Sequence, residues 1–284
     1  MDSISLLSYA KINLYLDILD KRPDNYHNIL TLFQEIDLAD KISFEETTSL
    51  IKLRSGGIKV PGGKENIIVR AALLLRETCK IKKGVNIRLE KNIPVSAGLG
   101  GGSSNAASTL KGLSLLWQIN IPREKLISLA SELGSDVPFF LTGGTCIGKG
   151  RGEILTPVYN TPSFWVVIIK PEIPVLTQWA YQKIELTKTI KTDKLKYPFF
   201  TDENYNFIAL KNNLYNKFEG CVIPEFPEIG EKKKELESFG LSALMSGSGS
   251  AVFGIIQEKR KAELAYRELK AKGEQVFLAK TRHH

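Results

Sequence analysis

The sequence predicts an α+β protein, an α/β sandwich built from two domains. Stretches with the two-residue period of strands alternate with stretches that have the helical period. Residues 227–279 repeat helix and strand signals in an order typical of such sandwiches. Two prolines follow a glycine-rich turn near residues 156–162, and 284 residues suffice for two domains. We therefore expect an N-terminal domain at residues 1–156 and a C-terminal domain at residues 157–284.

In the first half, strand-like stretches are separated by polar turns, one of them at residues 21–25. These stretches are residues 5–19, 29–38, 42–44, 51–53 and 85–89, and those at 42–44 and 51–53 alternate like edge strands. Helical periods occur at residues 66–80, 106–116 and 122–133. Pro122 is typical of a first helical turn.

The second half begins with a strongly apolar strand at residues 164–169. A lysine-rich stretch at residues 188–196 has no clear period. The C-terminal elements are then expected as helix 227–239, strand 241–245, turn 246–250, strand 251–256, helix 259–272 and strand 275–279.

Composition excludes several protein classes. Apolar residues make up 43% and charged residues 25%, as in ordinary globular proteins. No apolar run approaches the roughly 18 residues of a membrane span, and the first residues lack the pattern of a secretory signal. Three widely spaced cysteines without a Cys-x-x-Cys pair predict neither disulfides nor a zinc site, so we expect a cytoplasmic protein. The terminal His283 and His284 are compatible with a tag remnant and are left out of the functional reasoning.

The formal net charge of +8 favours an acidic partner, such as nucleic acid, anionic lipid or a phosphorylated small molecule. Charge alone does not choose among these partners. The lysines are spread along the chain, so most are expected to lie on solvated faces.

The sharpest local feature is the segment from Pro94 to Asn105, which follows a strand and opens a helix. Glycine permits backbone conformations that other residues resist and lets amides approach a ligand closely. Together with a helix N-terminus, this pattern favours phosphate binding over a simple capped turn. The segment lacks the Gly-Lys-Ser/Thr of a Walker loop and the third glycine of a Rossmann fingerprint. Its candidate phosphate-binding residues are Gly98, Gly100, Gly101, Gly102, Ser103 and Ser104.

Other residues are unusual for their surroundings. Lys11 interrupts an apolar strand, where it either reaches an anion or extends to solvent. Asp136 precedes a very apolar stretch, where it is either functional or a helix cap. Tyr26 and His27 follow a turn and either stack on a base or close the loop. The glycine-serine segment at residues 246–250 by itself indicates only a tight hairpin.

Taken together, these blocks resemble the GHMP kinases. The similarity rests on residues 10–13, Tyr26-His27, and residues 98–107, 135–140 and 246–250, and it extends over about residues 8–256. The motifs are most similar to those of family members that phosphorylate a methylerythritol carrying a cytidine diphosphate group.

This resemblance implies an N-terminal domain like domain 2 of ribosomal protein S5 and a ferredoxin-like C-terminal domain, with ATP and substrate meeting between them. It implies transfer of the ATP γ-phosphate to the 2-hydroxyl of the methylerythritol moiety, in the non-mevalonate route to isoprenoid precursors. ATP and Mg²⁺ are the implied cofactors. We expect no nucleic-acid or membrane partner, and a monomer or weak homodimer.

The resemblance also implies roles for individual residues. Asp136 would be the general base, assisted by Lys11. The implied ATP-binding residues are Asn66, Lys91, Pro94, Gly98, Gly100, Gly101, Gly102, Ser103 and Ser104, with Ser104 also a magnesium ligand. The implied substrate-binding residues are Asn13, Tyr26, His27, Asp136, Thr177, Tyr181, Gly247 and Ser248, with Tyr26 and Tyr181 on either side of the cytosine and His27 at its polar edge.

Three alternatives remain open. Another GHMP kinase, such as a mevalonate or homoserine kinase, would leave Tyr26-His27 without a base to bind. A nucleic-acid-binding module is favoured by the charge, but the basic residues are not interleaved with aromatic residues. A non-catalytic nucleotide sensor would be expected to lack Lys11 or Asp136, and both are present.

Overall fold

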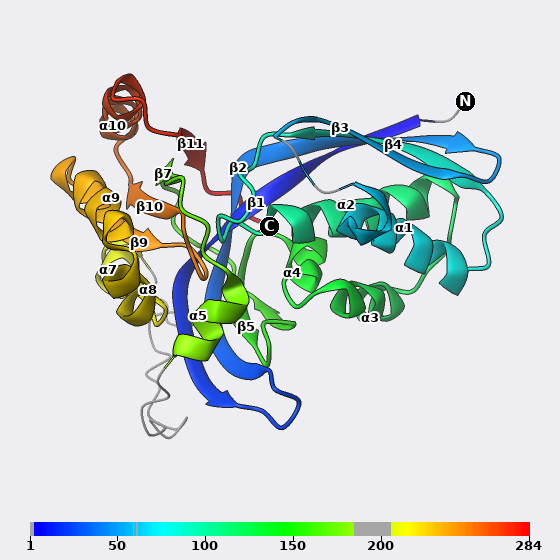
Figure 1. The fold of residues 1–284 in the computed structure, drawn as a ribbon, viewed down its shortest axis with the longest axis horizontal. Helices are drawn as coiled ribbons and strands as arrows, with labels where there is room; N and C mark the ends of the chain where they lie inside the picture. The colour runs from blue at the N-terminus through cyan, green and yellow to red at the C-terminus, as the bar shows by residue number, and fades with distance from the viewer. Residues whose placement is uncertain (1–2, 59, 61, 185–205) are drawn as a thin grey trace. The chain divides into compact units, whose positions relative to one another are not determined.

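The computed structural model describes residues 3–58, 60, 62–184 and 206–284, which form two compact units (Figure 1). Within the described residues, unit 1 contains segments 3–10, 39–95 and 100–142, and unit 2 contains Lys11–Leu38, Ser96–Leu99 and Gly143–His284. The long strands β1 (Ser3–Lys21) and β2 (His27–Thr47) contribute residues to both units. The expected domain boundary at residue 156 stays a prediction, and the stretch at 188–196 lies outside the described residues.

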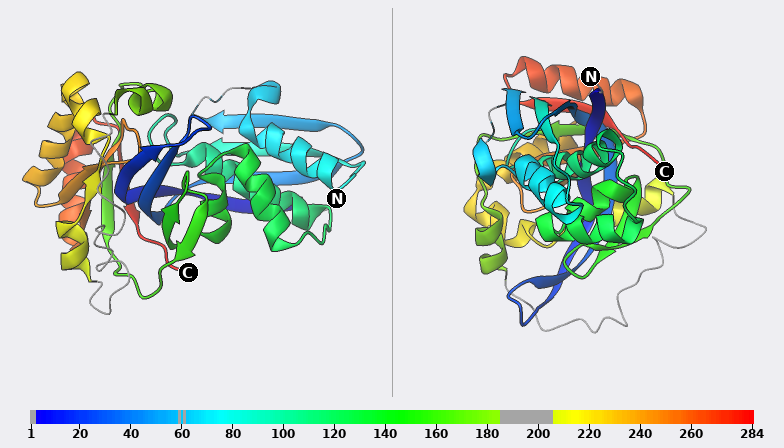
Figure 2. Two further views of the ribbon diagram at one scale, coloured as in Figure 1. Left: turned by 90° about the horizontal axis from the view of Figure 1, so that it is seen from below. Right: turned by 90° about the vertical axis from the view of Figure 1, so that its right-hand side faces the viewer.

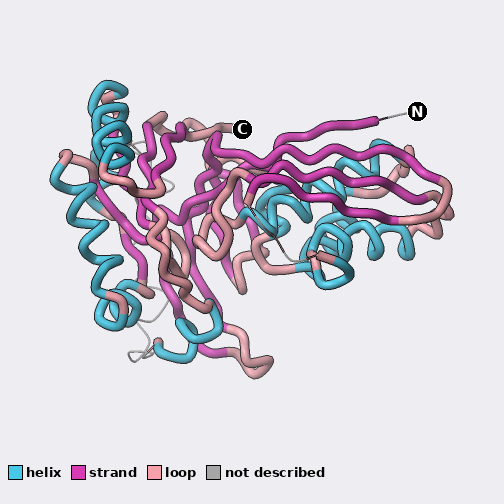
Figure 3. The backbone as a smooth tube through the Cα atoms, turned by 45° about the horizontal axis from the view of Figure 1, so that its top comes forward, coloured by secondary structure: helices cyan, strands magenta, loops and turns pink. Residues whose placement is uncertain are grey.

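In unit 1, the strand order is β3-β4-β2-β1, and helices α1, α2 and α3 lie on one face of these strands (Figure 3). Its remaining elements are β3 (Ile51–Gly57), a 3-10 turn (Gly63–Glu65), α1 (Ile67–Thr78), β4 (Gly84–Lys91), α2 (Gly101–Leu116), α3 (Arg123–Leu133) and α4 (Val137–Thr142).

The packing of unit 1 follows from sequence periodicity. Along β4, Val85, Ile87 and Leu89 are buried, whereas the alternate residues are more exposed. Helix α2 approaches the sheet closely at Gly112, because a Cβ atom there would lie 2.4 Å from the Phe44 ring. The apolar alternation of the strands and the small residues of α2 therefore create one layer of helices on one layer of sheet.

In unit 2, β7 (Trp165–Ile169), β9 (Ser242–Met245), β10 (Val252–Ile256) and β11 (Val276–Lys280) form an antiparallel sheet in the order β11-β7-β10-β9. Helices α9 (Pro227–Ser238) and α10 (Lys259–Ala271) cover one face of this sheet (Figure 2). The connections follow the βαββαβ scheme of ferredoxin-like domains. A core of buried apolar residues joins the sheet and both helices.

Further elements of unit 2 surround residues 11–38 of the long strands. Strand β8 pairs in parallel with β1, and β5 pairs with β2 and β6. These elements are β5 (Thr145–Lys149), β6 (Ile154–Pro157), α5 (Thr177–Lys183), α7 (Phe207–Asn212), β8 (Tyr215–Asn216) and α8 (Glu219–Glu225).

The predicted α+β class is confirmed, and the C-terminal elements agree with prediction to within a few residues. Two local predictions were wrong. The stretches 29–38 and 42–44 belong to the single strand β2, which continues through the polar residues Asp37, Asp40 and Lys41. Pro122 caps α3 instead of lying in its first turn. The polar residues suggested that the strand ends at residue 38. It continues because Asp40 is fully buried and its charge is paired with that of Lys91.

Candidate active site

The glycine loop connects β4 to α2 with two left-handed glycines. Gly98 has φ +71° and Gly100, the N-cap of α2, has φ +69°. Helix α2 begins at Gly101, so Ser103 and Ser104 lie in its first turn instead of in the preceding loop. The first amides of a helix have no acceptor within the helix, and the helix dipole is positive there. The first turn of α2 therefore offers donors suited to an anion such as phosphate.

Within unit 2, the start of this loop contacts the second glycine-serine segment. The Ser246 hydroxyl donates a hydrogen bond to the Gly98 carbonyl at 3.0 Å. A Cβ atom on Gly98 would lie 1.9 Å from the Ser246 carbonyl oxygen, so only glycine is accommodated there. The two segments that sequence analysis singled out separately thus meet in the structure.

Lys11 is buried, with only 3% of its surface exposed, and so does not extend to solvent. Its ammonium donates to Asn13 Oδ1 at 2.6 Å and lies 5.4 Å from the centre of the Phe33 ring. Asn13 Nδ2 in turn donates to the Thr31 hydroxyl at 2.8 Å. The Lys11 amide donates to the Leu99 carbonyl at 3.0 Å. A backbone hydrogen bond therefore joins β1 to the glycine loop at the position of the buried Lys11.

Polar groups also join the glycine-serine segment to neighbouring elements. The hydroxyls of Thr177, the first residue of α5, and Ser248 lie 2.9 Å apart. Asn216 Nδ2 donates to the Gly247 carbonyl at 2.8 Å and to the Met245 carbonyl at 2.7 Å. Gly247 adopts a left-handed conformation with φ +56°. This segment is therefore held from two sides by side chains of unit 2.

An aromatic group is present at the turn between β1 and β2. His27 stacks on Tyr181 with ring centres 5.0 Å apart, and Phe218 meets the edge of Tyr181 at 4.9 Å. Tyr26 is 54% exposed, and the Arg151 guanidinium lies 4.9 Å from its ring. Burial, reinforced by nearby Lys21, lowers the pKa of His27. The ring is thus held neutral at pH 7, with one nitrogen available as donor and one as acceptor.

The remaining predicted residues lie in unit 1. Asn66 is the N-cap of α1, and its side chain accepts a hydrogen bond from the Ile68 amide at 2.9 Å. Lys91 forms a buried ion pair with Asp40. Burial lowers the pKa of Lys91, and the nearby Asp40 carboxylate opposes that shift. The Ser104 hydroxyl accepts a hydrogen bond from Ser8 at 2.8 Å. Asp136 is half-buried directly before α4.

The predicted site residues therefore form two groups. Unit 2 contains Lys11, Asn13, Tyr26, His27, Gly98, Thr177, Tyr181, Gly247 and Ser248, and unit 1 contains Asn66, Lys91, Pro94, Gly100, Gly101, Gly102, Ser103, Ser104 and Asp136. Their roles stay predictions.

Sequence analysis missed several residues that hold these groups in place. Thr31 and Asn216 anchor the unit 2 group, and Asp40 and Asn105 hydrogen-bond each other in unit 1. Asp40 carries little signal in the sequence, because Asp37 and Lys41 make its neighbourhood polar. Asn216 and Thr31 carry no signal in the sequence, because uncharged polar residues are common in strands and loops.

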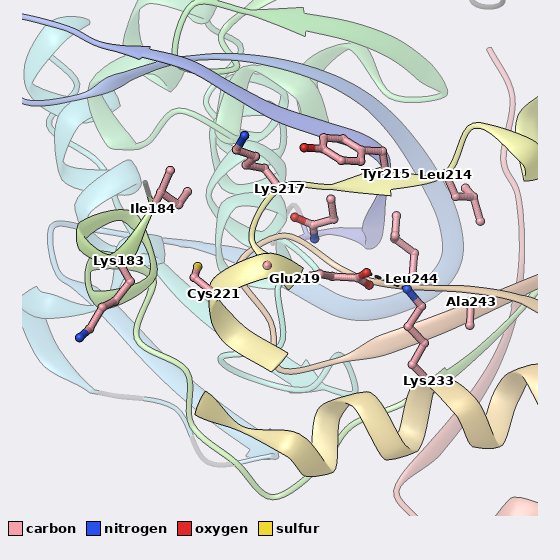
Figure 4. Close-up of a pocket in the computed structure, with 12 residues that line it drawn as sticks. Lys183, Ile184, Leu214, Tyr215, Lys217, Glu219, Cys221, Lys233, Ala243 and Leu244 are labelled. Carbon is pink, nitrogen blue, oxygen red and sulfur yellow. Dashed lines mark hydrogen bonds and ion pairs between the residues drawn. The ribbon is translucent and has the colours of Figure 1, made fainter. Parts of the chain in front are cut away.

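Unit 2 also contains a cavity of about 670 Å³ beside the edge strand β9 (Figure 4). Lys233 points to Glu219, with which it forms an ion pair at 2.7 Å, whereas the Lys183 ammonium points away from both. None of the predicted site residues lines this cavity. Asn216 lines it and also bonds the glycine-serine segment, so the cavity adjoins the predicted substrate group without being part of it.

Within residues 3–58, 60, 62–184 and 206–284, no cluster of three or more His, Cys, Asp or Glu side chains is suited to hold a metal ion. Across the same residues, no helix combines the length and apolar character needed to cross a bilayer.

Comparison with known proteins agrees with these features. Residues 66–144 match the sequence profile described as GHMP kinases N terminal domain, and residues 204–275 match GHMP kinases C terminal. The chain is 41% identical over 279 residues to the 4-diphosphocytidyl-2-C-methyl-D-erythritol kinase of Geobacillus kaustophilus, covering 96% of this chain and 95% of the relative. It is 39% identical to the enzyme of the same name from Alkaliphilus metalliredigens, covering 99% and 97%.

Solved structures give the same result. A crystal structure of 4-(cytidine 5'-diphospho)-2C-methyl-D-erythritol kinase superimposes with a TM-score of 0.82 at 34% identity, covering 99% of this chain and 100% of the other. A homoserine kinase from Cytophaga hutchinsonii has a TM-score of 0.71 at 17% identity, covering 100% and 95%, and shares the fold.

The fold, the glycine loop and these similarities define an ATP-dependent kinase. More narrowly, the chain belongs to the GHMP kinase family, which confirms the resemblance inferred from its motifs.

Proposed function

We propose that the protein transfers the γ-phosphate of ATP to the 2-hydroxyl of 4-diphosphocytidyl-2-C-methyl-D-erythritol, in the non-mevalonate route to isoprenoid precursors. The observation that carries this proposal is the stacking of His27, on β2, against Tyr181, on α5, in the same unit whose strand β1 holds Lys11 and Asn13. Two relatives that share 39–41% identity with this chain are named 4-diphosphocytidyl-2-C-methyl-D-erythritol kinase.

The spacing along the strands supports a long substrate with two recognised ends. Thr31, which accepts a hydrogen bond from Asn13, lies four residues beyond His27 on β2. Four residues of an antiparallel strand span about 14 Å. A substrate with a base at one end, a diphosphate in the middle and an alcohol at the other needs two such separated points. The aromatic side chains would bind the base, and Asn13 and Lys11 would bind near the alcohol.

Asp136 is proposed as the general base for the 2-hydroxyl, with Lys11 stabilising the developing alkoxide. The Lys11 ammonium is buried and donates a hydrogen bond to Asn13 Oδ1, which supports placing both side chains near the reacting hydroxyl in this proposal. Phosphoryl transfer needs little beyond positioning and charge stabilisation, which the side chains of Asp136 and Lys11 would supply. Magnesium would supply charge neutralisation for the ATP phosphates, with Ser104 as the proposed protein ligand.

The test is an ADP-release assay with Mg-ATP and three acceptors: the cytidine-diphosphate substrate, mevalonate and homoserine. Turnover with the first alone is the expected result. Turnover with mevalonate or homoserine would support the proposed kinase chemistry but contradict the proposed pocket for a base. Solved mevalonate and homoserine kinases at 14–17% identity share the fold, so fold alone does not decide between these acceptors.

The proposed reaction involves only small molecules, so no nucleic-acid or membrane partner is required. The state of the protein as a monomer or weak homodimer stays a prediction. Steeply salt-dependent RNA binding would instead favour a nucleic-acid-binding function.

A further inference from the structure

Asp40 on β2 is a fully buried carboxylate with four hydrogen-bond donors. Its Oδ1 accepts from the amides of Asn92 and Ile93, both at 2.8 Å. Its Oδ2 accepts from the Lys91 ammonium and, at 2.8 Å, from Asn105 Nδ2. An ionised carboxylate has about four acceptor positions, so this set satisfies it completely. Such saturation offsets the large free-energy penalty of burying a charge.

The four donors come from both ends of the glycine loop. Asn92 and Ile93 directly follow β4 and lead into the loop, whereas Asn105 lies in α2, which leaves it. Asn105 Nδ2 also donates to the Ser8 hydroxyl at 2.9 Å, and Ser8 donates to the Ser104 hydroxyl at 2.8 Å. One carboxylate thus links the entry of the loop to the first two turns of the helix.

The Asp40 carboxylate also pairs with the Lys91 ammonium beside the N-terminus of α2. A Cβ atom on Gly101 would lie 2.8 Å from the Lys91 ammonium, so this cation lies against the first turn of α2. A cation is unfavourable at the positive end of a helix dipole unless a counter-charge is present. Asp40 supplies that counter-charge and raises the pKa of Lys91 against the lowering caused by burial. The ion pair with Asp40 therefore holds the Lys91 ammonium beside the first turn of α2, where it would attract an anionic ligand.

We propose that Asp40 is a positioning residue for ATP, which sets both ends of the glycine loop and holds the charged Lys91 against α2. This inference rests on the proposed assignment of the loop to the ATP phosphates. Asp40 acts through Lys91 and the loop, without contacting the nucleotide itself.

The test is Asp40→Asn, which preserves shape and removes the charge. The amide oxygen can still accept from the Asn92 and Ile93 amides, but its NH₂ group then faces two other donors, Lys91 and Asn105. We expect the KM for ATP to rise at least tenfold, with the KM for the phosphoryl acceptor within twofold of wild type. Glu46→Gln is the matched control, because Glu46 is on the same strand but pairs with exposed Lys83 at 2.9 Å. That control should leave both constants unchanged.

A double-mutant cycle with Lys91→Met identifies the route of the effect. If Asp40 acts through Lys91, the double variant should have nearly the same KM for ATP as Lys91→Met alone. A purely structural role would lower the melting temperature of Asp40→Asn and leave its KM for ATP within twofold, which would overturn the inference. Should Asp40→Asn fail to fold, the double variant, which loses both charges, replaces it. A wild-type KM for ATP in that double variant would equally overturn the inference.

Failure of the inference is distinguishable from failure of the loop assignment. Gly102→Ala places a methyl group at the exposed surface of the first turn without a clash. If it leaves the KM for ATP unchanged, the loop assignment is wrong. If it raises that KM whereas Asp40→Asn does not, the loop assignment stands and the role of Asp40 is rejected.

Discussion

Substituting Gly102 with alanine separates the stability of α2 from its proposed binding of phosphate. Gly102 is the second residue of α2 and is exposed, and the nearest atom to a new Cβ, on Ile67, would be 3.9 Å away. Its backbone is not left-handed. The folded protein therefore accommodates the methyl group, and loss of glycine freedom in the unfolded chain should stabilise the protein by about 0.4–1 kcal/mol. The melting temperature should rise by about 1–4 °C.

The same Gly102→Ala substitution should weaken the binding of ATP. A phosphate oxygen bonded to the first amides of α2 would occupy the space of the new methyl group. Loss of one hydrogen bond to a charged group costs about 1.5–3 kcal/mol, which predicts at least a tenfold rise in the KM for ATP. The assay is ADP release at varied ATP, paired with thermal unfolding of the same preparation.

Gly220→Ala is the matched control. Gly220 is the second residue of α8, is exposed, has no left-handed backbone, and would have no atom within 4 Å of a new Cβ. It should change stability to a similar small extent without changing the KM for ATP. If both variants are equally stable and equally active at low ATP, phosphate does not bind at the first turn of α2, and the reasoning is refuted.

Four further predictions concern other residues. Asp136→Asn should retain substrate binding, measured by calorimetry, and lose about 10²–10⁴-fold in turnover; near-normal turnover would contradict its role as base. Tyr181→Leu should raise the KM for the cytidine substrate about two- to tenfold through lost stacking; an equal rise in the KM for ATP would argue against a base pocket. Burial lowers the pKa of His27, so stability from its neutral ring is present above the unfolded-state value of about 6.5 and is lost as pH falls below it. In thermal unfolding, the melting temperature of His27→Gln should therefore fall less between about pH 7 and pH 5 than that of the wild type. An equal fall in both proteins would contradict this prediction. Burial also raises the pKa of the Cys146 thiol to about 12, so mass spectrometry should find it unalkylated until the protein unfolds.

The candidate site was predicted without coordinates from signals that are local. A glycine run between a strand and a helix, a lysine within an apolar strand and paired turn residues each reflect constraints on a few neighbouring residues. The helices and strands of residues 227–279 were likewise indicated by their periods, since periodicity reports which face of each element is buried, whereas the ferredoxin-like order was implied by the resemblance to GHMP kinases.

Local signals failed where a distant partner changed the meaning of a residue. The strand predicted at residues 29–38 ended before Asp40, and a charge without a partner is costly to bury. The strand continues because Lys91, Asn92, Ile93 and Asn105 meet that carboxylate in the folded chain. Likewise, Gly98 is explained by the Ser246 carbonyl, which lies far away in sequence.

The sequence by itself determined the α+β class, the helical and strand periods and the resemblance to GHMP kinases, because each is carried by short segments or by their order along the chain. Only the tertiary structure decided that Lys11 is buried beside Asn13, that Tyr181 stacks on His27 and that Asp40 links the two ends of the glycine loop. These contacts join residues through space, and their free energy depends on burial and partners that exist only once the chain has folded.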